Sequence, residues 1–224
     1  IENHLLNHAG YHSGNSKDFD TEFAVDKRQF WEFLETTQSE ELDKLRDSPD
    51  WQRLILERLN RKIKKNGVLS LLKKGLAIDD ANLTLFYSLP YNDLNPQIQA
   101  NFAQNRFSLT RQLYFSASDS NPSIDLVIFL NGLPIITIEL KNPWTNQTVY
   151  KAKTQYQDRD PNEPLFQFGR CLVHFALDTD EAWMTTRLAG KNTYFLPFNK
   201  GHNHGKGNPV NPNGHKTAYL WQDI

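Results

Sequence analysis

The stretch IDLVIFLNGLPIITIEL, residues 124–140, constrains the fold more than any other part of the chain. Two apolar runs rich in β-branched residues flank an Asn-Gly dipeptide, which is typical of two-residue hairpin turns. The stretch therefore predicts a β-hairpin, and runs this apolar predict that it is buried within a sheet. Yet Asp125 begins the hairpin and Glu139 and Lys141 end it, although a buried charge is costly unless it is paired.

Strand pairing around this turn predicts that the two carboxylates meet. With a loop of about two to four residues, Asp125 lies opposite Glu139 or one residue away from it. Directly opposed Cβ atoms are roughly 4.5 to 5.5 Å apart, and carboxylates this close repel each other unless a cation lies between them. Because side chains alternate along a strand, Glu139 and Lys141 are expected to share one face of the sheet.

These groups suit the hydrolysis of a phosphodiester. Mg²⁺ prefers carboxylate, water and phosphate oxygens, and Asp125, Glu139 and a backbone carbonyl at Leu140 are the expected protein ligands. The ion would polarise the phosphate and activate a water, while Lys141 would orient that water or offset charge developing on phosphorus. The competing interpretation is that both ends of the hairpin are merely solvated.

Helical patterns dominate the sequence before the hairpin. Residues 2–9 predict a short helix that ends at Gly10. Residues 26–74 are helical in pattern almost throughout, and the last long segment ends with basic residues at Gly67, as the helix dipole favours. The pattern over residues 75–91 is ambiguous.

The remaining elements follow from caps and apolar runs. They are a helix opened by Asn95 and Pro96, a strand over 107–115, a helix capped by Thr145 and ending near 158, strands over 171–177 and 182–188, and a surface loop over 199–215. His174, inside the apolar run 171–177, is interpreted as a core histidine. We expect residues 1–224 to form one α/β domain, with a mixed central sheet flanked by helices and a mostly helical insertion at 26–105.

The order of elements resembles a known nuclease core. A short helix, three strands with Glu-x-Lys on the third, a helix and a further strand are the αβββαβ core of the PD-(D/E)XK nuclease superfamily, where the acidic residues and lysine occupy these places.

The likeness extends to longer stretches. GYHSGNSKDFD, IDLVIFLNGLPIITIELKNPWTNQTV, QYQDRDPNEPLFQFGRCLVHFALDTDEAWMTTRL and YFLPFNKG resemble the N-terminal nuclease domain of the R subunit of type I restriction-modification enzymes. The resemblance implies type I site-specific deoxyribonuclease activity, with Asp125, Glu139 and Lys141 in the metal-dependent cleavage site. It also implies a supporting glutamate on the first helix, matched by Glu2, and a glutamine matched by Gln155.

Both supporting residues have a simpler explanation. The glutamine belongs to a Gln-x-x-x-Tyr pattern in the family, and here Arg159 replaces the tyrosine. Gln155 is equally compatible with an ordinary amide on a helix surface. Glu2 is equally compatible with a first-turn glutamate favoured by the helix dipole.

The resemblance also implies partners. These are double-stranded DNA, Mg²⁺, an ATP-dependent motor C-terminal to the nuclease domain, and the methyltransferase and specificity subunits. The loop Gly201–Gly207 lacks the spacing and the Ser or Thr of a phosphate-binding loop, so ATP is expected only in the full-length protein. The alternative is a non-catalytic, nuclease-like module that docks the motor or holds DNA.

Composition narrows these possibilities only slightly. The net charge of −1 requires that any contact with DNA be local. Such a contact is expected at the basic end of one helix, at Arg58, Arg61, Lys62, Lys64 and Lys65, which is otherwise a solvated helix terminus. The single cysteine and the lack of an apolar run of about 20 residues predict a cytoplasmic protein with no membrane span. Since the chain does not begin with Met, we expect it to be part of a longer protein.

Overall fold

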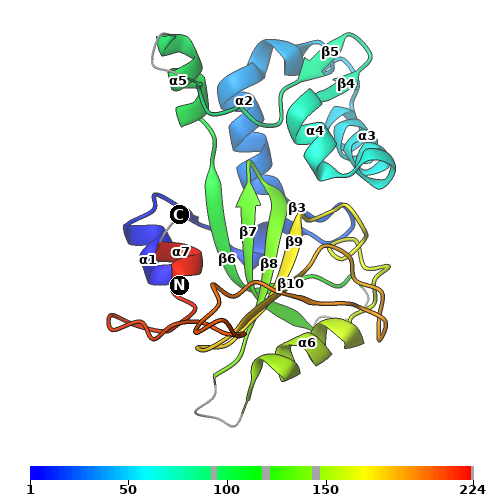
Figure 1. The fold of residues 1–224 in the computed structure, drawn as a ribbon. Coiled ribbons are helices and arrows are strands. Elements are labelled where there is room, and N and C mark those ends of the chain that lie inside the picture. Colours follow the sequence, from blue (N-terminus) through cyan, green and yellow to red (C-terminus); the bar gives the residue numbers. More distant parts are fainter. Residues whose placement is uncertain (92–94, 118–121, 143–146, 223–224) are drawn as a thin grey trace.

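A mixed β-sheet forms the centre of the molecule (Figure 1). The computed structural model describes residues 1–91, 95–117, 122–142 and 147–222. Within these residues, seven strands form one sheet in the order β1-β6-β7-β8-β9-β10-β11. Pairing is parallel between β1 and β6 and between β8 and β9, and antiparallel between the other neighbours. The prediction of an α/β fold with a mixed central sheet is therefore confirmed.

The elements have the following bounds. The strands of this sheet are β1 (His12–Ser13), β6 (Phe107–Tyr114), β7 (Ser123–Leu130), β8 (Leu133–Leu140), β9 (Val173–Leu177), β10 (Ala182–Thr185) and β11 (Leu196–Pro197). Separate ribbons pair β2 (Phe19–Asp20) with β3 (Val25–Asp26), and β4 (Leu76–Ile78) with β5 (Ala81–Leu83). The helices are α1 (Glu2–Asn7), α2 (Lys27–Asp43), α3 (Trp51–Asn66), α4 (Val68–Lys74), α5 (Pro96–Ala103), α6 (Val149–Asp158) and α7 (Tyr219–Gln222), with a 3-10 turn at Ser16–Asp18.

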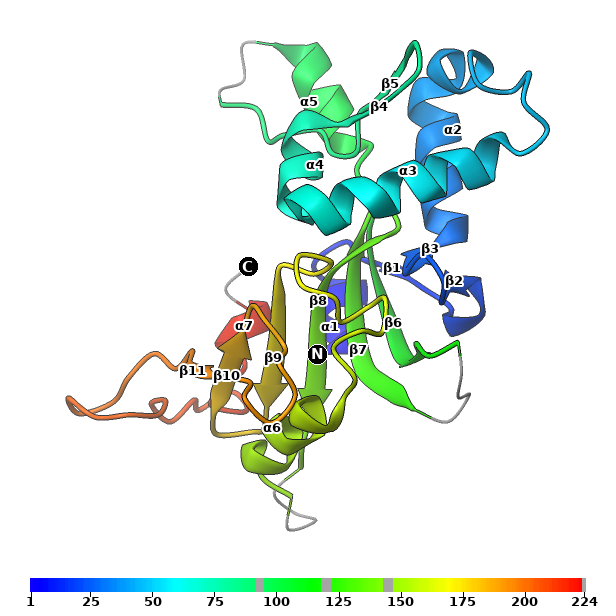
Figure 2. The same ribbon diagram turned by 90° about the vertical axis from the view of Figure 1, so that its right-hand side faces the viewer.

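Helices α2 to α5 and the β4–β5 ribbon form a helical lobe at one end of the sheet (Figures 1 and 2). The helices predicted within residues 26–74 and after Asn95 are confirmed, and the ambiguous stretch 75–91 contains the ribbon. α2 departs from helical geometry at Gln38, where its side-chain amide bonds both the backbone N–H and the carbonyl of Thr84. No helix in the described part of the chain is long and apolar enough to cross a membrane.

The two faces of the sheet bury different sets of side chains. Ile128 and Ile138 pack in a core shared with α1 and the helical lobe, whereas Val127 packs in a second core with α6. Neighbouring residues thus point to opposite faces, as the apolar pattern predicted. The helix α6 therefore covers the face of β8 that carries Glu139.

The predicted Asn-Gly turn is confirmed. Asn131 and Gly132 both have positive φ, 51° and 79°, as a type I′ hairpin turn requires, and Leu130 pairs with Leu133 across it. The turn rests against the start of α2, because the N–H of Asp26 donates to the carbonyl of Gly132 at 2.9 Å.

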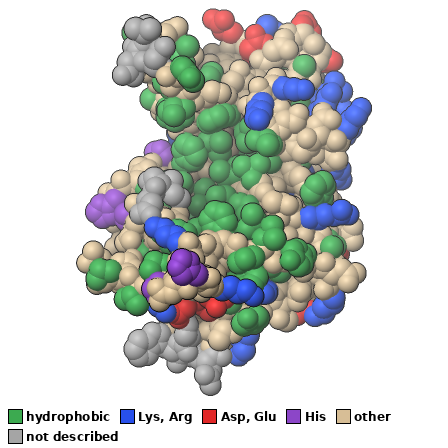
Figure 3. All heavy atoms as spheres, in the orientation of Figure 1, with side chains coloured by type: hydrophobic (Ala, Val, Ile, Leu, Met, Phe, Trp, Pro, Cys, Tyr) green, Lys and Arg blue, Asp and Glu red, His purple; other side chains and the backbone are tan. Residues whose placement is uncertain are grey.

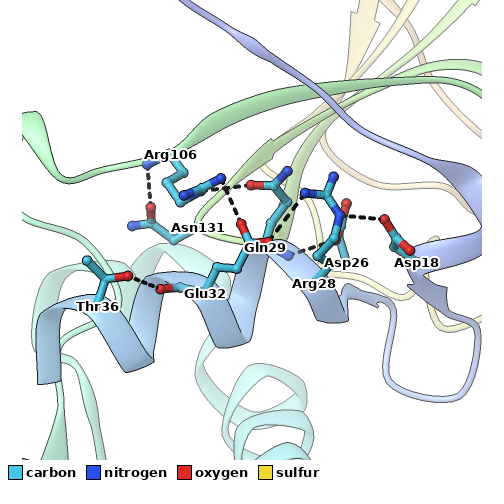
Figure 4. A network of polar contacts seen from close by, with 8 residues as sticks. All are labelled: Asp18, Asp26, Arg28, Gln29, Glu32, Thr36, Arg106 and Asn131. Atoms are coloured by element: carbon cyan, nitrogen blue, oxygen red, sulfur yellow. Dashed lines mark hydrogen bonds and ion pairs between the residues drawn. The ribbon is translucent and has the colours of Figure 1, made fainter. Parts of the chain in front are cut away.

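Polar side chains surround this turn (Figure 4). The side-chain carbonyl of Asn131 accepts from the N–H of Arg106 at 2.7 Å, and its amide donates to the carbonyl of Leu85 at 2.9 Å. The guanidinium of Arg106 in turn contacts Gln29 and Glu32 of α2. These contacts attach the hairpin to the helical lobe.

One face of the molecule is hollowed and apolar (Figure 3). Apolar side chains gather there below the helical lobe, and a cavity of about 400 Å³ is lined by Ile128, Ile138 and Phe175 of the sheet together with residues of α1 and α7. This hollow lies on the face of the sheet away from α6, because Ile128 and Ile138 belong to the core on that side.

Candidate functional site

The open end of the β7–β8 hairpin brings Asp125 and Glu139 together. Leu126 pairs with Ile138, and continuing this register by one residue places Asp125 opposite Glu139. Oδ2 of Asp125 also accepts a hydrogen bond from the backbone N–H of Leu140 at 2.8 Å. The predicted meeting of the two ends of the hairpin is therefore confirmed.

A local irregularity in the neighbouring strand places Asp125. Gln112 of β6 has a positive φ of 45°, and the β6–β7 ladder is interrupted there. Its side-chain amide donates to Oδ1 of Asp125 at 3.0 Å and accepts from the hydroxyl of Ser123 at 3.0 Å. Gln112 was not predicted to belong to the site, because a positive φ at a non-glycine residue leaves no reliable mark in a single sequence.

The carboxylate of Glu139 is buried, with 1% of the residue exposed. Burial raises the pKa of Glu139 to about 7, against the ion pair with Arg159, while the nearby charge of Asp125 raises it further. A carboxylate with this pKa readily takes up either a proton or a cation near neutral pH.

Arg159 follows the last residue of α6 and contacts the site from that side. Its Nη2 pairs with Oε1 of Glu139 and donates to the carbonyl of Ser123 at 2.6 Å. The Arg159 guanidinium also lies 4.8 Å from the ring centroid of Phe115. In the sequence, Arg159 stands out only as a departure from a family pattern, and its ion pair with Glu139 was not predicted.

Lys141 and Gln155 line one cavity beside the hairpin. The cavity, of about 330 Å³, lies between the end of β8 and α6 and is also lined by Gln147, Lys151 and Thr154. The backbone N–H of Lys141 donates to the carbonyl of Leu177 at 2.8 Å, which extends the pairing of β8 with β9 by one residue. The structure therefore brings Lys141 and Gln155 to the same place, as the sequence analysis expected.

The start of α6 is fixed by Asp178. Oδ2 of Asp178 accepts from the N–H of Val149 at 2.8 Å, and its Oδ1 accepts from the N–H groups of Asp180 and Glu181. Thr145, predicted to cap this helix, lies outside the described residues. Asp178 directly follows the apolar strand β9, and this position at the end of a buried strand is the sequence signal that points to it.

Glu2 lies on α1 and bonds to the neighbouring strand. Its Oε2 is 2.9 Å from Nη1 of Arg111. Arg111 immediately precedes Gln112, which contacts Asp125. Glu2 is thus bound to β6, next to the residue that contacts Asp125, through its ion pair with Arg111.

The basic residues expected to contact DNA lie far from the open end of the hairpin. Arg58, Arg61, Lys62, Lys64 and Lys65 all belong to α3 in the helical lobe. β8 ends beside α6, at the opposite end of the sheet from this lobe (Figures 1 and 2). The structure does not bring the basic end of α3 into the site.

A buried chain of hydrogen-bonded side chains joins β9, β8 and α6 next to the site. His174 is 2% exposed, as predicted for a core histidine, and burial lowers its pKa to about 4. Its Nδ1 is 2.7 Å from the hydroxyl of Thr137, which lies 2.8 Å from the hydroxyl of Tyr156. Thr137 is on the same face of β8 as Glu139, so these bonds tie α6 and β9 to that face.

The carboxylates fit a hard divalent cation. No cluster of three or more His, Cys, Asp or Glu suited to metal occurs among the described residues. Mg²⁺ needs no such cluster, because it commonly uses one or two carboxylates and keeps several waters. Asp125 and Glu139 would supply the oxygens, because an oxygen that already accepts one hydrogen bond keeps a further lone pair. Burial raises the pKa of Glu139 to about 7 although Arg159 lies beside it, so its ionised form would gain from a further positive charge.

Comparison with known proteins identifies the family. Residues 2–193 match the family described as "Type I restriction enzyme R protein N terminus" (HSDR_N). The chain belongs to this family. The putative type I restriction enzyme MjaIXP endonuclease subunit of Methanocaldococcus jannaschii is 32% identical over 77 residues, which are 33% of this chain and 7% of that protein. The chain thus aligns with a small part of this curated relative.

The family match confirms the resemblance found in the sequence. It covers all five residues assigned to the cleavage site, Glu2, Asp125, Glu139, Lys141 and Gln155. In this R-protein N terminus, three of them lie at the open end of the hairpin or directly after it, Gln155 faces the same cavity as Lys141, and Glu2 is bonded to the adjacent strand.

Proposed function

We propose that this domain is the metal-dependent nuclease of a type I restriction enzyme, and that it hydrolyses DNA phosphodiester bonds without reading their sequence. The observation that carries the proposal is the meeting of Asp125 with the buried Glu139 at the open end of one hairpin. Perturbed carboxylates of this kind gather at catalytic and metal sites. Membership in the R-protein family supports the choice of DNA as the substrate.

The element order supports a restriction-endonuclease-like core. α1, β6, β7, β8, α6 and β9 follow one another as the αβββαβ order requires, with Glu139 and Lys141 at the end of the third strand. On this reading residues 1–224 are one nuclease domain, and the helical lobe is an insertion between the first helix and the first core strand. The helical lobe contains none of the residues that are predicted to take part in cleavage.

Asp125 and Glu139, together with the backbone carbonyl of Leu140, are the residues that would hold Mg²⁺. When bound, Mg²⁺ supplies polarisation of the scissile phosphate and a lowered pKa for a coordinated water. Lys141 contributes a positive charge beside the site, which would orient the attacking water and offset the negative charge that develops on phosphorus. Asp125 is already oriented by Gln112 and Leu140 before any ligand arrives.

Gln155 and Glu2 have supporting roles. Gln155 lines the cavity next to Lys141 and is exposed, so its amide can donate to a phosphate oxygen or to the attacking water. Glu2 acts through Arg111, because its ion pair joins α1 to the strand that holds Asp125 through Gln112.

The test uses the complete restriction enzyme with Glu139→Ala or Lys141→Ala. Cleavage should be lost while ATP hydrolysis and DNA translocation persist, because both changes are confined to the nuclease site. Lys191→Ala is the matched control, since Lys191 is an exposed lysine that pairs with Asp158 at the end of α6 and does not line the cavity. Cleavage that survives Glu139→Ala would remove the assignment.

The partners follow from the same proposal. The complete protein would carry an ATP-dependent motor in cis, which supplies the ATP dependence, and would assemble with methyltransferase and specificity subunits. Recognition of a DNA sequence would belong to those subunits, since the proposed site contains groups for phosphate chemistry only.

One observation favours a second candidate, a nuclease-like module that holds DNA or docks the motor without cutting. Arg159 already provides Glu139 with a cation, so the carboxylate pair is partly neutralised without metal. Titration of the chain with Mg²⁺ or Mn²⁺ discriminates between the two candidates. Binding that Asp125→Asn abolishes supports the nuclease, and salt-sensitive DNA binding that ignores both metal and this substitution supports the module.

The basic end of α3 is proposed as a separate, non-specific DNA contact. Five cations lie there in one helix, and phosphate contacts of this kind supply affinity independent of sequence. Each lysine changed to alanine should weaken DNA binding equally on all sequences and lower the salt slope by about one. Cleavage chemistry in the assembled enzyme should be unaffected, because the site lies at the other end of the sheet.

A further inference from the structure

Arg159 is the cation that contacts the proposed metal site. It lies directly after α6, and one guanidinium nitrogen binds both Oε1 of Glu139 and the carbonyl of Ser123. Only 12% of its side chain is exposed. Ser123 opens β7 and Glu139 is near the end of β8, so Arg159 links the two strands at the open end of the hairpin.

Aromatic rings hold this guanidinium in place. Its centre lies 4.8 Å from the ring centroid of Phe115 and 5.9 Å from that of Phe166. Its Nε is buried and has no hydrogen-bond partner among the described residues. A guanidinium buried with one of its donors unpaired is costly, so the charge of Glu139 is the main interaction that retains Arg159 there.

The charges around Glu139 are unequal. Asp125 and Glu139 are two close carboxylates, and Arg159 supplies one positive charge to them. A divalent ion on the same pair would supply two. Because the ion and the guanidinium would both lie next to Glu139, they would repel each other in a poorly solvated place where such repulsion is strong.

We propose that Arg159 is a positioning residue that serves as an internal counter-cation for Asp125 and Glu139, and that it competes with a divalent ion for Glu139. Without metal, Arg159 holds the carboxylate in place. When metal binds, Arg159 loses part of its interaction with Glu139, so its presence weakens metal binding. This inference rests on the proposed nuclease site.

If Arg159 competes with Mg²⁺ for Glu139, its removal should change stability differently with and without the metal. Removing the guanidinium should destabilise the metal-free chain, and Mg²⁺ should then restore more stability than it gives to the wild type. The apparent Kd for Mg²⁺ should become tighter by about tenfold, which is within the usual range of coupling between two sites. A side chain that only fills space would change stability equally with and without metal.

The experiment compares the wild-type chain with Arg159→Met and Arg159→Lys. Mg²⁺ binding is measured by isothermal titration calorimetry, and thermal unfolding is followed with and without Mg²⁺. All measurements are made at pH 9, where protons compete least for the carboxylates. Arg159→Met keeps a long apolar stem against Phe115, and Arg159→Lys keeps the charge as the charge control. If the Met variant does not fold, Arg159→Gln replaces it, because it also removes the charge and should show the same larger Mg²⁺-dependent shift.

Arg106→Met is the matched control. Arg106 pairs with Glu32 and Gln29 at the other end of the same hairpin. Its loss should lower the unfolding temperature and leave the Mg²⁺-dependent shift unchanged.

The expected result is a larger Mg²⁺-dependent rise in unfolding temperature and tighter Mg²⁺ binding for Arg159→Met, with Arg159→Lys close to the wild type. An equal metal-dependent shift in all proteins, or a smaller shift in Arg159→Met, overturns the competition. If Asp125→Asn does not alter Mg²⁺ binding either, the proposed metal site itself has failed. The two failures are therefore distinguishable.

Discussion

The two ends of the β7–β8 hairpin both bury polar groups, but they do so in different ways. At the turn, Asn131 has its side-chain donor and acceptor paired with backbone groups of two other segments. At the open end, the carboxylate of Glu139 lies against one guanidinium and close to a second carboxylate. The side chain in the turn is neutral and fully paired, whereas the side chains that meet at the open end are charged.

The turn end explains how the hairpin is attached. Its bonds run to the start of α2, to the residue before β6 and to the segment after β5, which are far apart in the sequence. Figure 4 shows the bond between Asn131 and Arg106. Neutral hydrogen bonds of this kind stabilise one arrangement of the backbone. Asp26, which bonds to the turn through its backbone, is the exception, because Oδ2 of its buried carboxylate has no hydrogen-bond partner among the described residues and burial raises its pKa.

The open end has the opposite character. Its pKa shift arises because burial and a neighbouring carboxylate disfavour the ionised form of Glu139. This arrangement costs stability that a bound cation would restore. The two ends therefore differ in that only the open end brings two carboxylates, Asp125 and Glu139, together, and this pair is what marks the proposed site.

The largest expected effect is on cleavage. Glu139→Gln keeps the shape of the open end and removes its charge, so cleavage by the complete enzyme should fall by at least about a hundredfold. The fold, measured by circular dichroism, should persist. The comparison breaks if this variant still cuts DNA, or if Asn131→Gly at the turn abolishes cleavage in protein that remains folded.

The next effect concerns the turn. A Cβ on Gly132 would lie 2.5 Å from the backbone nitrogen of Phe30 and 2.6 Å from the carbonyl oxygen of Asp26, at a φ of +79°. Gly132→Ala should lower the free energy of unfolding by roughly 3 kcal/mol or more, because strain and steric overlap add.

Gly10→Ala is the control for that substitution. Gly10 has a similar φ of +73° but nothing within 4 Å of its Cβ position. Gly10→Ala should lower the free energy of unfolding by about 1–2 kcal/mol, because only the strain of a positive φ opposes the added methyl group. Equal losses at the two glycines in urea unfolding would show that the turn is not packed against α2 as described.

The third effect is the pH dependence of stability. The pKa of Glu139 is about 7 in the folded chain and ordinarily 4.5, so the folded state binds its proton more tightly than the unfolded state. The resulting stabilisation is complete below pH 4.5 and is lost as the pH rises through 7, by about 3 kcal/mol in total.

Urea unfolding at several pH values tests this effect. Glu139→Gln has no carboxyl group to ionise, so its free energy of unfolding should not fall as the pH rises. The difference between this variant and the wild type should therefore grow, in favour of the variant, from pH 4.5 to pH 8. Saturating Mg²⁺ should reduce the difference, because a bound cation favours the ionised carboxylate. Parallel profiles for the two proteins would contradict the unbalanced charge at the open end.

The smallest expected effect is the loss of one neutral side chain at the turn. Asn131→Gly permits the positive φ of 51° and removes the bonds to Arg106 and Leu85. The free energy of unfolding should fall by about 1–3 kcal/mol, because buried backbone groups lose their partners. Asn203→Gly is the control, since Asn203 has a φ of 48° in an exposed loop, and it should change stability by no more than about 0.5 kcal/mol.

Much of the fold was predictable because its signals are local. The Asn-Gly turn, the helix that ends at Gly67 and the helix capped by Asn95 each depend on residues within a few positions of one another. The meeting of Asp125 and Glu139 was predictable for the same reason, since a two-residue turn sets the register of both strands.

The partners of the site residues were not predictable. Arg159 reaches Glu139 across 20 positions, and Gln112 reaches Asp125 across 13. α3 belongs to the lobe at one end of the sheet, and β8 ends at the other end (Figure 1). The basic residues of α3 and the hairpin carboxylates are therefore far apart, although both were expected to contact DNA.

By itself, the sequence determined the hairpin, the pairing of its two carboxylates and the order of elements around it, because turn chemistry and apolar alternation act over neighbouring residues. Only the tertiary structure decided which charges surround Glu139. The ionisation of a buried carboxylate depends on every group packed around it, and packing brings together residues whose separation in the chain carries no signal.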